Sequence, residues 1–436
     1  MDFEEFKYVR KLAGAIQRAV PEPDDRFASH LQAKLLPLVP RKRFVFQHAV
    51  KLAIAACLVL AAGGALLFHS RLLRSAIEND TGWCFVEYDA GNSRHSLGTT
   101  PCAPDDLLWQ TSLPDNASLY KPLAWNKFII AGTGNTGDAA LCAYDAATGN
   151  PAWRTALPSG DYFKNRRFPD RCIVSRKLYV TNGRECMVLD PADGRITGAF
   201  APPSSSWGWS YLAADKERVY GLSSDGRRLF ALGRESGKPL WTKTFESQVQ
   251  VPAVAGGFVL CHEKKGRLTA VATATGQCLW QAENTGIIGT STVHAYGRYA
   301  AVLGDNDRIA LFDIATGKMA WTKDVTAASQ SGVAMGEDAL YLRNGSAAFN
   351  LATGNKEWDL EESGANLCAS PTIVGNQVLS LTGSGLGTFK LLDASGGILK
   401  SLKNSDAGIC GGAIVLGGQF FAVGSSRIQA FGCSKG

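Results

Sequence analysis

The chain has 436 residues, a formal net charge of +6 and 45% apolar residues, so its length suits two or three average domains or one large repeat array. Its lysines and arginines are scattered and form no long basic stripe, which argues against nucleic-acid binding. The 47 glycines and 10 tryptophans, together with short apolar runs, favour turns and large packed side chains over helices.

Residues 1–48 predict a short helical tail. Apolar residues recur at spacings of three and four from Phe3 to Val20, which is the pattern of one face of an amphipathic helix. Pro21 ends this pattern, and a second helix is expected after it. Residues 26–43 resemble the juxtamembrane segment of some bacterial anti-sigma-type membrane proteins, and a surface helix that lies on the membrane is the other interpretation.

Residues 49–69 predict a transmembrane helix, because residues 52–68 carry no charge and reach the short end of a membrane span. Basic residues are more frequent before the span than after it. This bias places the N-terminus in the cytoplasm and the C-terminal part outside the inner membrane, in the periplasm or the extracellular space. A buried soluble helix and lipidation at Cys57 are the alternatives. Residues 70–104 read as a linker.

From residue 105 onward one motif recurs. It reads LCAYDAATGNPAW at 141–153, LFALGRESGKPLW at 229–241 and IALFDIATGKMAW at 309–321, and its variants make seven copies about 40 residues apart. Two more short strands are expected before each copy. A unit of four strands and about 40 residues has the size of one propeller blade.

Each copy encodes a strand, a tight turn and an outer strand. Asp and Thr side chains in the turn bond nearby backbone amides, and the glycine adopts a positive φ. An aromatic ring on the outer strand is expected to close the wedge to the next blade. The turn glycines are Gly149, Gly194, Gly237, Gly276, Gly317 and Gly354, and the docking residues are Trp109, Trp153, Trp241, Trp280, Trp321 and Trp358. Phe200 and an aliphatic residue near Leu402 are expected to replace the tryptophan in two blades and to loosen those interfaces.

An eighth copy stops after its first strand, whereas residues 105–113 read as an outer strand without a partner. Pairing these two segments completes an eighth blade and leaves no open edge. The sequence therefore predicts an all-β fold over 105–436, an eight-bladed β-propeller closed by strands from both of its ends.

Ten cysteines follow the predicted span, and in an oxidising compartment some of them would pair. The closure brings Cys102 near Cys433, and a local Cys84–Cys102 loop is the rival. Cys368 and Cys410 precede matching segments of consecutive blades and form a third candidate pair. The alternative is that several cysteines are buried strand residues that act as small hydrophobic groups.

The segments YDAATGNPAW, FDIATGKMAW and RESGKPLW resemble the tryptophan-docking motif of the quinoprotein-type (PQQ-like) β-propeller family. The resemblance covers residues 105–436 and implies an eight-bladed propeller. In one branch of that family, alcohol and glucose dehydrogenases bind pyrroloquinoline quinone and calcium on the propeller axis. The other branch, typified by the outer-membrane assembly factor BamB, binds no cofactor and works as a scaffold.

The residues favour the branch without a cofactor. The dehydrogenases hold the quinone against two adjacent cysteines, and this chain has no such pair. Asp145, Asp190 and Asp313 recur as turn residues, and no set of inward acidic and amide residues suggests a calcium cage. His262 and His294 fit packed or solvated histidines better than catalytic ones. We therefore expect no cofactor, no metal and no catalytic residue.

Two segments are candidates for partner contacts, because aromatic residues and arginine are enriched at interface hot spots. They contain Trp207 and Trp209, and Arg166, Arg167 and Phe168. Inward packing is the alternative for both segments. The sequence thus favours a single-pass inner-membrane protein whose propeller binds envelope or membrane proteins as a scaffold or sensor. A quinone (PQQ)-dependent dehydrogenase is the alternative, and no small-molecule ligand can be named.

Overall fold

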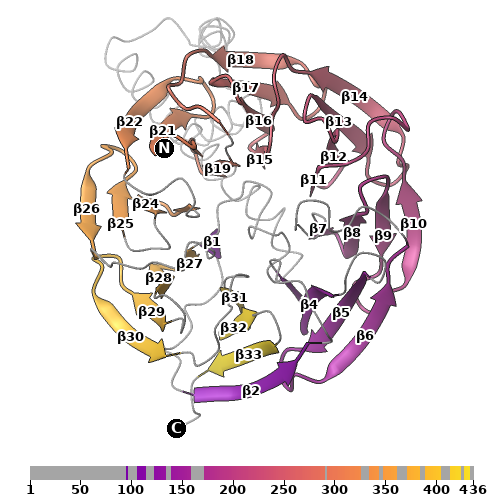
Figure 1. The fold of residues 1–436 in the computed structure, drawn as a ribbon, viewed down its shortest axis with the longest axis vertical. Helices are drawn as coiled ribbons and strands as arrows, with labels where there is room; N and C mark the ends of the chain where they lie inside the picture. Colours follow the sequence, from indigo (N-terminus) through magenta and orange to yellow (C-terminus); the bar gives the residue numbers. More distant parts are fainter. Residues whose placement is uncertain are drawn as a thin grey trace, which may run out of the picture. The chain divides into compact units, whose positions relative to one another are not determined.

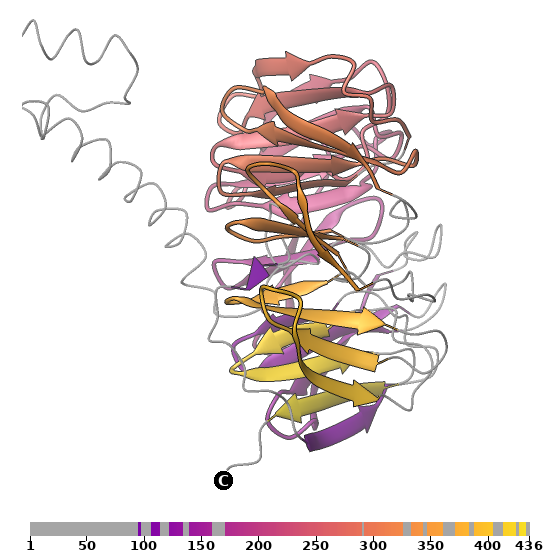
Figure 2. The ribbon, with the colours of Figure 1, turned by 90° about the vertical axis from the view of Figure 1, so that its left-hand side faces the viewer.

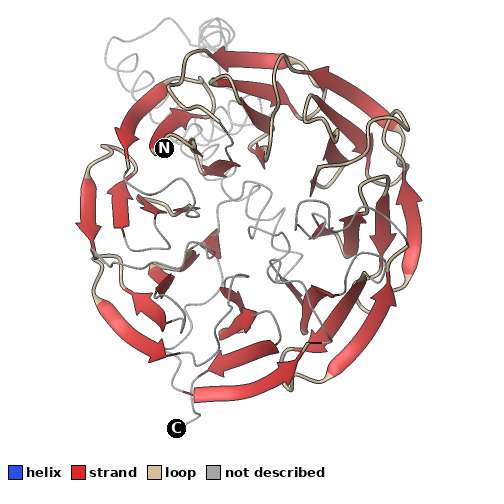
Figure 3. Cartoon of the chain, in the orientation of Figure 1, coloured by secondary structure: helices blue, strands red, loops and turns tan. Residues whose placement is uncertain are grey.

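The computed structural model describes residues 95–96, 106–113, 122–133, 139–158, 171–289, 292–325, 333–342, 347–360, 371–382, 388–403, 413–423 and 427–432. All of them belong to one compact unit, Ile77–Gly436. They form strands and loops and no helix (Figure 3), and so contain no helix long and apolar enough to cross a membrane. The expected tail (1–48) and transmembrane helix (49–69) lie outside the described residues.

The described strands form eight sheets, which are the blades of a ring (Figure 1). We number the blades in chain order and give the strands of each from the centre to the rim. Blade 1 contains β3 (Leu123–Trp125), β4 (Phe128–Thr133), β5 (Ala140–Asp145) and β6 (Pro151–Ala156). Blade 2 contains β7 (Arg171–Val174), β8 (Lys177–Thr181), β9 (Cys186–Leu189) and β10 (Ile196–Phe200). Blade 3 contains β11 (Tyr211–Ala214), β12 (Arg218–Leu222), β13 (Arg228–Gly233) and β14 (Pro239–Thr244). Blade 4 contains β15 (Ala253–Ala255), β16 (Phe258–Glu263), β17 (Arg267–Ala272) and β18 (Cys278–Ala282). Blade 5 contains β19 (Thr292–Tyr296), β20 (Tyr299–Leu303), β21 (Arg308–Asp313) and β22 (Met319–Asp324). Blade 6 contains β23 (Ala334–Met335), β24 (Ala339–Leu342), β25 (Ala347–Asn350) and β26 (Lys356–Asp359). Blade 7 contains β27 (Thr372–Val374), β28 (Gln377–Thr382), β29 (Thr388–Leu392) and β30 (Ile398–Lys403).

Blade 8 closes the ring with strands that lie far apart in the sequence. It contains β31 (Ala413–Leu416), β32 (Gln419–Val423), β33 (Arg427–Gly432) and β2 (Asp106–Ser112). The antiparallel register pairs Asp106 with Gly432 and Ser112 with Arg427. The prediction of an all-β, eight-bladed propeller is therefore confirmed.

One short strand joins the ring from the segment expected to be a linker. β1 (His95–Ser96) pairs in parallel with β27, with His95 opposite Ile373 and Ser96 opposite Val374. Because β27 is the innermost strand of blade 7, β1 lies near the centre of the ring (Figure 1).

The core lies between the blades. The middle strands are buried, as β13 shows with four consecutive buried residues, whereas the outer strand β14 alternates between exposed and half-buried positions. Buried side chains of neighbouring blades form joint clusters, such as Tyr220 of blade 3 with Val259 of blade 4. A four-stranded sheet cannot cover both of its own faces, so each blade depends on its neighbours.

An aromatic ring on the outer strand of one blade packs on the turn of the next. In blade 5, Trp321 pairs with Leu311, and its indole N–H donates a hydrogen bond of 2.8 Å to the carbonyl oxygen of Leu351 in blade 6. Its ring lies against Gly354, where an added Cβ would be 2.7 Å from the ring. The same bond, at 2.8 to 3.2 Å, joins Trp109 to Ala146, Trp153 to Pro191, Trp241 to Thr273, Trp280 to Ile314 and Trp358 to Ala394. The six turn glycines have φ between 63° and 74°.

Blade 2 reaches its neighbour in a different way. The strand register places Gly198 opposite Val188, at the position that a tryptophan occupies in the regular blades. Phe200 lies two residues further along the strand, and its ring packs on Gly237 of blade 3, 2.5 Å from where a Cβ would stand. Phe200 thus supplies the expected ring from a shifted position. A phenyl ring has no N–H, so it cannot make the hydrogen bond of the tryptophans.

In blade 7 the register gives Leu402 the shifted position that Phe200 takes in blade 2. The register places Lys400, opposite Leu391, at the docking position, and Leu402 pairs with Phe389. The closure of the ring also changes the surface that blade 7 meets. A docking ring would need the turn between the third and outer strands of blade 8, but those strands, β33 and β2, are not consecutive and share no turn.

Candidate functional site

The strand order sorts the connections onto two faces. In a blade of this topology, the turns after the first and third strands lie at one end of the strands. The hairpin after the second strand and the connection to the next blade lie at the other end. We call these the turn face and the loop face. Seen edge-on, the strands run across the thickness of the ring, so the two faces lie on opposite sides of it (Figure 2).

Trp209 lies in the loop-face connection between blades 2 and 3 and is only 4% exposed. Its ring meets that of Phe230 edge-on, with 4.9 Å between centroids, and occupies space that the missing side chain of Gly221 leaves free. Its backbone N–H donates to the carbonyl oxygen of Gly183. Trp209 therefore belongs to the core between these blades, which is the inward packing that the sequence left open beside a partner contact.

Trp207 is half-buried in the same connection. The guanidinium of Arg228 lies 5.4 Å from its ring centroid, and Arg228 also forms an ion pair of 2.6 Å with Asp225. The hydroxyl of Ser224 donates to the carbonyl oxygen of Trp207 at 2.7 Å. Trp207 keeps an exposed edge beside a cation, whereas Arg166, Arg167 and Phe168 lie outside the described residues.

A second loop-face connection, between blades 4 and 5, presents an apolar side chain to solvent. Ile288 is 61% exposed, while its neighbour Ile287 is fully buried. The backbone of Ile288 is held at both ends by blade 5, because its N–H donates to Asn306 Oδ1 and its carbonyl accepts from the N–H of Asp305 at 3.1 Å. Gly289 donates in turn to the carbonyl of Lys264 in blade 4. The exposed side chain thus stands on a backbone that both blades fix.

A cluster of charges beside this connection fixes the blade 4 hairpin. Arg267 contacts three carboxylates, those of Glu263 at 2.7 Å, Glu246 at 3.1 Å and Glu283 at 3.5 Å. The Glu263 side chain is only 1% exposed and also accepts from the N–H of Ser247 at 2.9 Å. Burial opposes ionisation of Glu263, but the bonds from Arg267 and from backbone amides outweigh it and lower the pKa. The cluster therefore links three segments of the loop face and stabilises their conformation.

The histidines of the propeller are packed rather than exposed. His262 and His294 are 2% and 6% exposed. Burial lowers the pKa of His262 to about 4, and its Nε2 lies 3.3 Å from the hydroxyl of Thr285. A histidine with this pKa is neutral at physiological pH.

The described cysteines are free thiols. Cys142, Cys172, Cys186 and Cys261 are buried, and Cys278 is exposed on β18. The five cysteines of the candidate disulfides (Cys84, Cys102, Cys368, Cys410 and Cys433) lie outside the described residues. Within the described ranges, no group of three His, Cys, Asp or Glu residues is placed to hold a metal ion.

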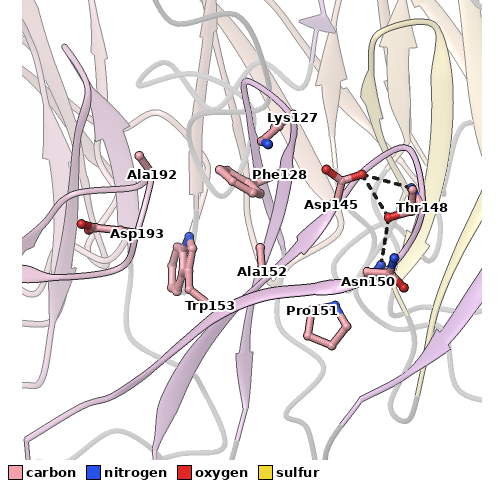
Figure 4. A pocket seen from close by; sticks show the side chains of 10 residues that line it. All are labelled: Lys127, Phe128, Asp145, Thr148, Asn150, Pro151, Ala152, Trp153, Ala192 and Asp193. Carbon is pink, nitrogen blue, oxygen red and sulfur yellow. Dashed lines mark hydrogen bonds between the residues drawn. The ribbon is translucent and has the colours of Figure 1, made fainter.

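A pocket of about 500 Å³ opens on the turn face between blades 1 and 2 (Figure 4). Its lining comes from two turns of blade 1, from the start of β6 and from the docking turn of blade 2: Lys127, Phe128, Asp145, Thr148, Asn150, Pro151, Ala152, Trp153, Ala192 and Asp193. Asp145 Oδ1 accepts from the N–H and the hydroxyl of Thr148, each at 3.2 Å. The turn chemistry expected of Asp145 is thus present, at the edge of a pocket that the sequence did not indicate.

Sequence reasoning also missed the Ile288 connection, although a signal was there. The segment TGIIG places two apolar residues between glycines in a connection that is otherwise polar. Gly286 and Gly289 both adopt positive φ, at 76° and 93°, and this conformation turns one isoleucine inward and the other outward.

A family model described as outer membrane protein assembly factor BamB matches residues 102–199, 187–295 and 264–403. Together these matches span most of the propeller and more than half of the chain. The chain belongs to this family. A comparison of the sequence with curated proteins gives no match.

Solved structures extend the likeness at low sequence identity. BamB from Moraxella catarrhalis is 16% identical, with a TM-score of 0.56, over 76% of this chain and 98% of that one. A europium-containing methanol dehydrogenase is 11% identical, with a TM-score of 0.60, over 81% and 98% of the two chains. A quinohemoprotein alcohol dehydrogenase from Comamonas testosteroni is 12% identical, with a TM-score of 0.61, over 81% of each chain. At these identities the structures show a common fold and no common activity.

Proposed function

We propose that the chain is a membrane-anchored scaffold that binds an envelope protein through its loop face, without a cofactor and without catalysis. The observation that carries this proposal is the presentation of Ile288, which is 61% exposed while its backbone is bonded to the hairpin of blade 5. An apolar side chain on a backbone that is already fixed requires little ordering of the backbone on binding, which is the property of an interface anchor.

The surroundings of Ile288 suggest the chemistry of the partner. Lys264 and Lys265 are exposed at the tip of the neighbouring hairpin, and the carbonyl of Lys264 accepts from Gly289 in the Ile288 connection. We expect the partner to offer an apolar pocket for Ile288 and carboxylates for the two lysines. Opposite charges at the rim of such a contact mainly raise the association rate and fix the register.

The anchor in this proposal is the segment 49–69, and its support comes from the sequence. The uncharged residues 52–68 and the excess of basic residues before them favour a cytoplasmic N-terminus and a propeller outside the inner membrane. The family description names an outer-membrane assembly factor, which supports an envelope role. A sensor that reports binding to the cytoplasmic tail is a variant of the same proposal.

Site-specific photo-crosslinking in the source cell tests the scaffold role. A photoreactive amino acid at position 288 of the full chain should give a discrete crosslinked product, and the product should weaken when Lys264 and Lys265 are both changed to Ala. The matched control is position 240, because Leu240 on the rim is also exposed, at 52%. Equal products from positions 288 and 240, or none from 288, would count against the loop face as the binding surface.

Protease protection tests the anchor. In cells with a permeable outer layer, added protease should cleave the propeller and leave a membrane-bound fragment that contains the tail. Extraction at alkaline pH should leave the full chain in the membrane. Release of the intact chain by alkali would contradict a membrane span.

The likeness to alcohol dehydrogenases keeps a quinone-dependent activity as the second candidate. Mass and visible spectra of the purified chain, with and without added pyrroloquinoline quinone and Ca²⁺, separate the two functions. The scaffold predicts no bound quinone and no thermal shift. A stoichiometric quinone with a calcium-dependent shift would favour the enzyme.

A further inference from the structure

The repeats allow one blade to be compared with another at the same position. In blades 1 and 5, the first turn ends in a basic residue followed by an aromatic one, Lys127–Phe128 and Arg298–Tyr299. Phe128 pairs with Asp145, and Tyr299 pairs with Asp313. The two sites therefore have the same backbone frame and the same residue types.

In blade 5 this site is filled from within the chain. The guanidinium of Arg298 lies 5.2 Å from the centroid of the Tyr299 ring and donates to Asp313 Oδ2 through both Nε and an Nη, at 3.2 and 2.6 Å. Asp313 Oδ1 is reserved for the turn, because it accepts from the N–H and the hydroxyl of Thr316. One carboxylate oxygen thus accepts hydrogen bonds from the turn, and the other accepts them from the guanidinium.

In blade 1 the same frame lacks the ion pair. The ammonium of Lys127 lies 5.3 Å from the centroid of the Phe128 ring, as Arg298 lies over Tyr299, but Lys127 forms no ion pair with Asp145. Asp145 Oδ1 serves the turn through Thr148. Among the described residues, Asp145 Oδ2 has neither a hydrogen-bond nor an ion-pair partner. The oxygen that binds a guanidinium in blade 5 is therefore available in blade 1.

The space that a ligand needs is also present in blade 1. Ala152, the residue before the docking tryptophan Trp153, lines the pocket of about 500 Å³. Blades 3 and 4 carry Leu240 and Leu279 at this position, and both leucine side chains are about half exposed. The pocket in blade 1 is thus lined by a short side chain at 152 and by a lysine at 127 where blade 5 carries an arginine.

We propose that this pocket is a binding site for a guanidinium group supplied from outside, such as the arginine side chain of a partner polypeptide. The guanidinium would bind Asp145 Oδ2, as that of Arg298 binds Asp313 Oδ2, and lie on the side of the ring of Trp153, because the ammonium of Lys127 already lies over the ring of Phe128. Asp193 adds a second carboxylate, so the lining carries one more acidic group than basic groups. Aromatic rings and carboxylates together are the surroundings that arginine prefers.

The site is separate from the surface proposed for scaffold function. It lies on the turn face between blades 1 and 2, whereas Ile288 lies on the loop face between blades 4 and 5. The two proposals can therefore fail independently. A partner that reaches both faces would gain affinity from two linked contacts.

Saturation-transfer NMR on the purified full chain tests the site, with N-acetyl-arginine amide as the probe and N-acetyl-lysine amide as the comparison. We expect transfer to the arginine side chain with a dissociation constant on the order of a millimolar, since one exposed contact is weak. The lysine probe should give a signal several-fold weaker, because an ammonium lacks the planar pair of N–H groups that converge on one carboxylate oxygen in blade 5. Equal signals from the two probes, or no transfer to the arginine probe, would overturn the proposal.

Three variants make the test specific. Lys127→Arg should close the site with an internal pair like that of Arg298 and Asp313, and Ala152→Leu should fill it with the residue of blades 3 and 4. Each should lower the transfer to the arginine probe at least about fivefold while the melting temperature stays unchanged. Arg298→Lys should open the equivalent site in blade 5 and raise the signal. Wild-type transfer in Lys127→Arg and Ala152→Leu would place the probe elsewhere and contradict the assignment.

Discussion

The indole N–H of Trp321 in blade 5 donates a 2.8 Å hydrogen bond to the carbonyl oxygen of Leu351 in blade 6, while the ring of Trp321 covers Gly354. One side chain thus both caps a turn of the next blade and fills the wedge between two sheets. The bond is polar and directional, so it fixes how far the blades rotate against each other. The packing supplies most of the stabilisation, since a large buried ring removes much apolar area from water.

These two contributions can be separated by substitution at 321. Trp321→Phe keeps a ring over Gly354 but removes the N–H donor, and we expect it to lower the free energy of unfolding by about 1 kcal/mol. Trp321→Ala also leaves a cavity and should cost about 3 to 5 kcal/mol. Chemical denaturation of both variants measures the difference. Equal losses would mean that the hydrogen bond, and not the ring, holds the two blades together.

The docking glycines should tolerate no side chain, for two reasons that can be told apart. At Gly317, φ is 69° and a Cβ would lie 2.5 Å from the ring of Trp280. At Gly257, φ is 87° but nothing lies within 4 Å of the Cβ position. Gly257→Ala should therefore cost only the left-handed strain of about 1 kcal/mol. Gly317→Ala should cost at least about 2 kcal/mol more, because the tryptophan must move. Equal shifts in thermal unfolding would show that the close approach is relieved at little cost.

The sequence was sufficient for the fold because every blade repeats the same local chemistry. Positive-φ glycines mark the docking turns, an outer-strand tryptophan bonds to the next turn in six described blades, and the unpartnered strand at 105–113 indicates how the ring closes. The exceptions depend on register. Neither Gly198 nor Lys400 stands out in the sequence, and only the pairing with Val188 and Leu391 places them at docking positions.

The binding surfaces were harder to predict, because they depend on what surrounds each side chain. Trp209 reads as an exposed aromatic, yet the missing side chain of Gly221 makes room for it in the core. Ile288 reads as an ordinary apolar residue, yet two glycines turn it outward. The pocket beside Asp145 brings together residues of two blades, from Lys127 to Asp193, which composition and periodicity do not reveal.

The closing strand should be indispensable. β33 pairs with both β32 and β2, and its residues Ile428 and Ala430 are fully buried. Removal of residues 427–436 should abolish cooperative unfolding, because blade 8 then loses its third strand and β2 loses its partner. Removal of residues 433–436 alone, under reducing conditions, is the control and should leave the transition unchanged. Retention of a single cooperative transition by the longer deletion would contradict the closure.

Buried histidine should make the propeller sensitive to mild acid. The pKa of His262 falls to about 4 because the ring is buried, whereas an unfolded histidine titrates near 6.5. Below about pH 6.5 this histidine binds a proton in the unfolded chain, whereas in the folded chain it stays neutral until the pH approaches 4. The stability that depends on neutral His262 is therefore fully present above about pH 6.5 and is lost as the pH falls towards 4. Between about pH 7.5 and 5, His262 alone should lower the free energy of unfolding by about 2 kcal/mol.

The variant His262→Gln tests this origin of the acid sensitivity. Glutamine retains a polar group near the Thr285 hydroxyl but does not titrate, so the variant should lose about 2 kcal/mol less than the wild type over the same pH range. Comparing the two slopes, and not the absolute stabilities, removes any cost of the substitution itself. Glu263 is present in both proteins, so the acid loss expected from its lowered pKa cancels in the comparison. Parallel slopes for the two proteins would assign the sensitivity to other groups and contradict the neutral, buried state of His262.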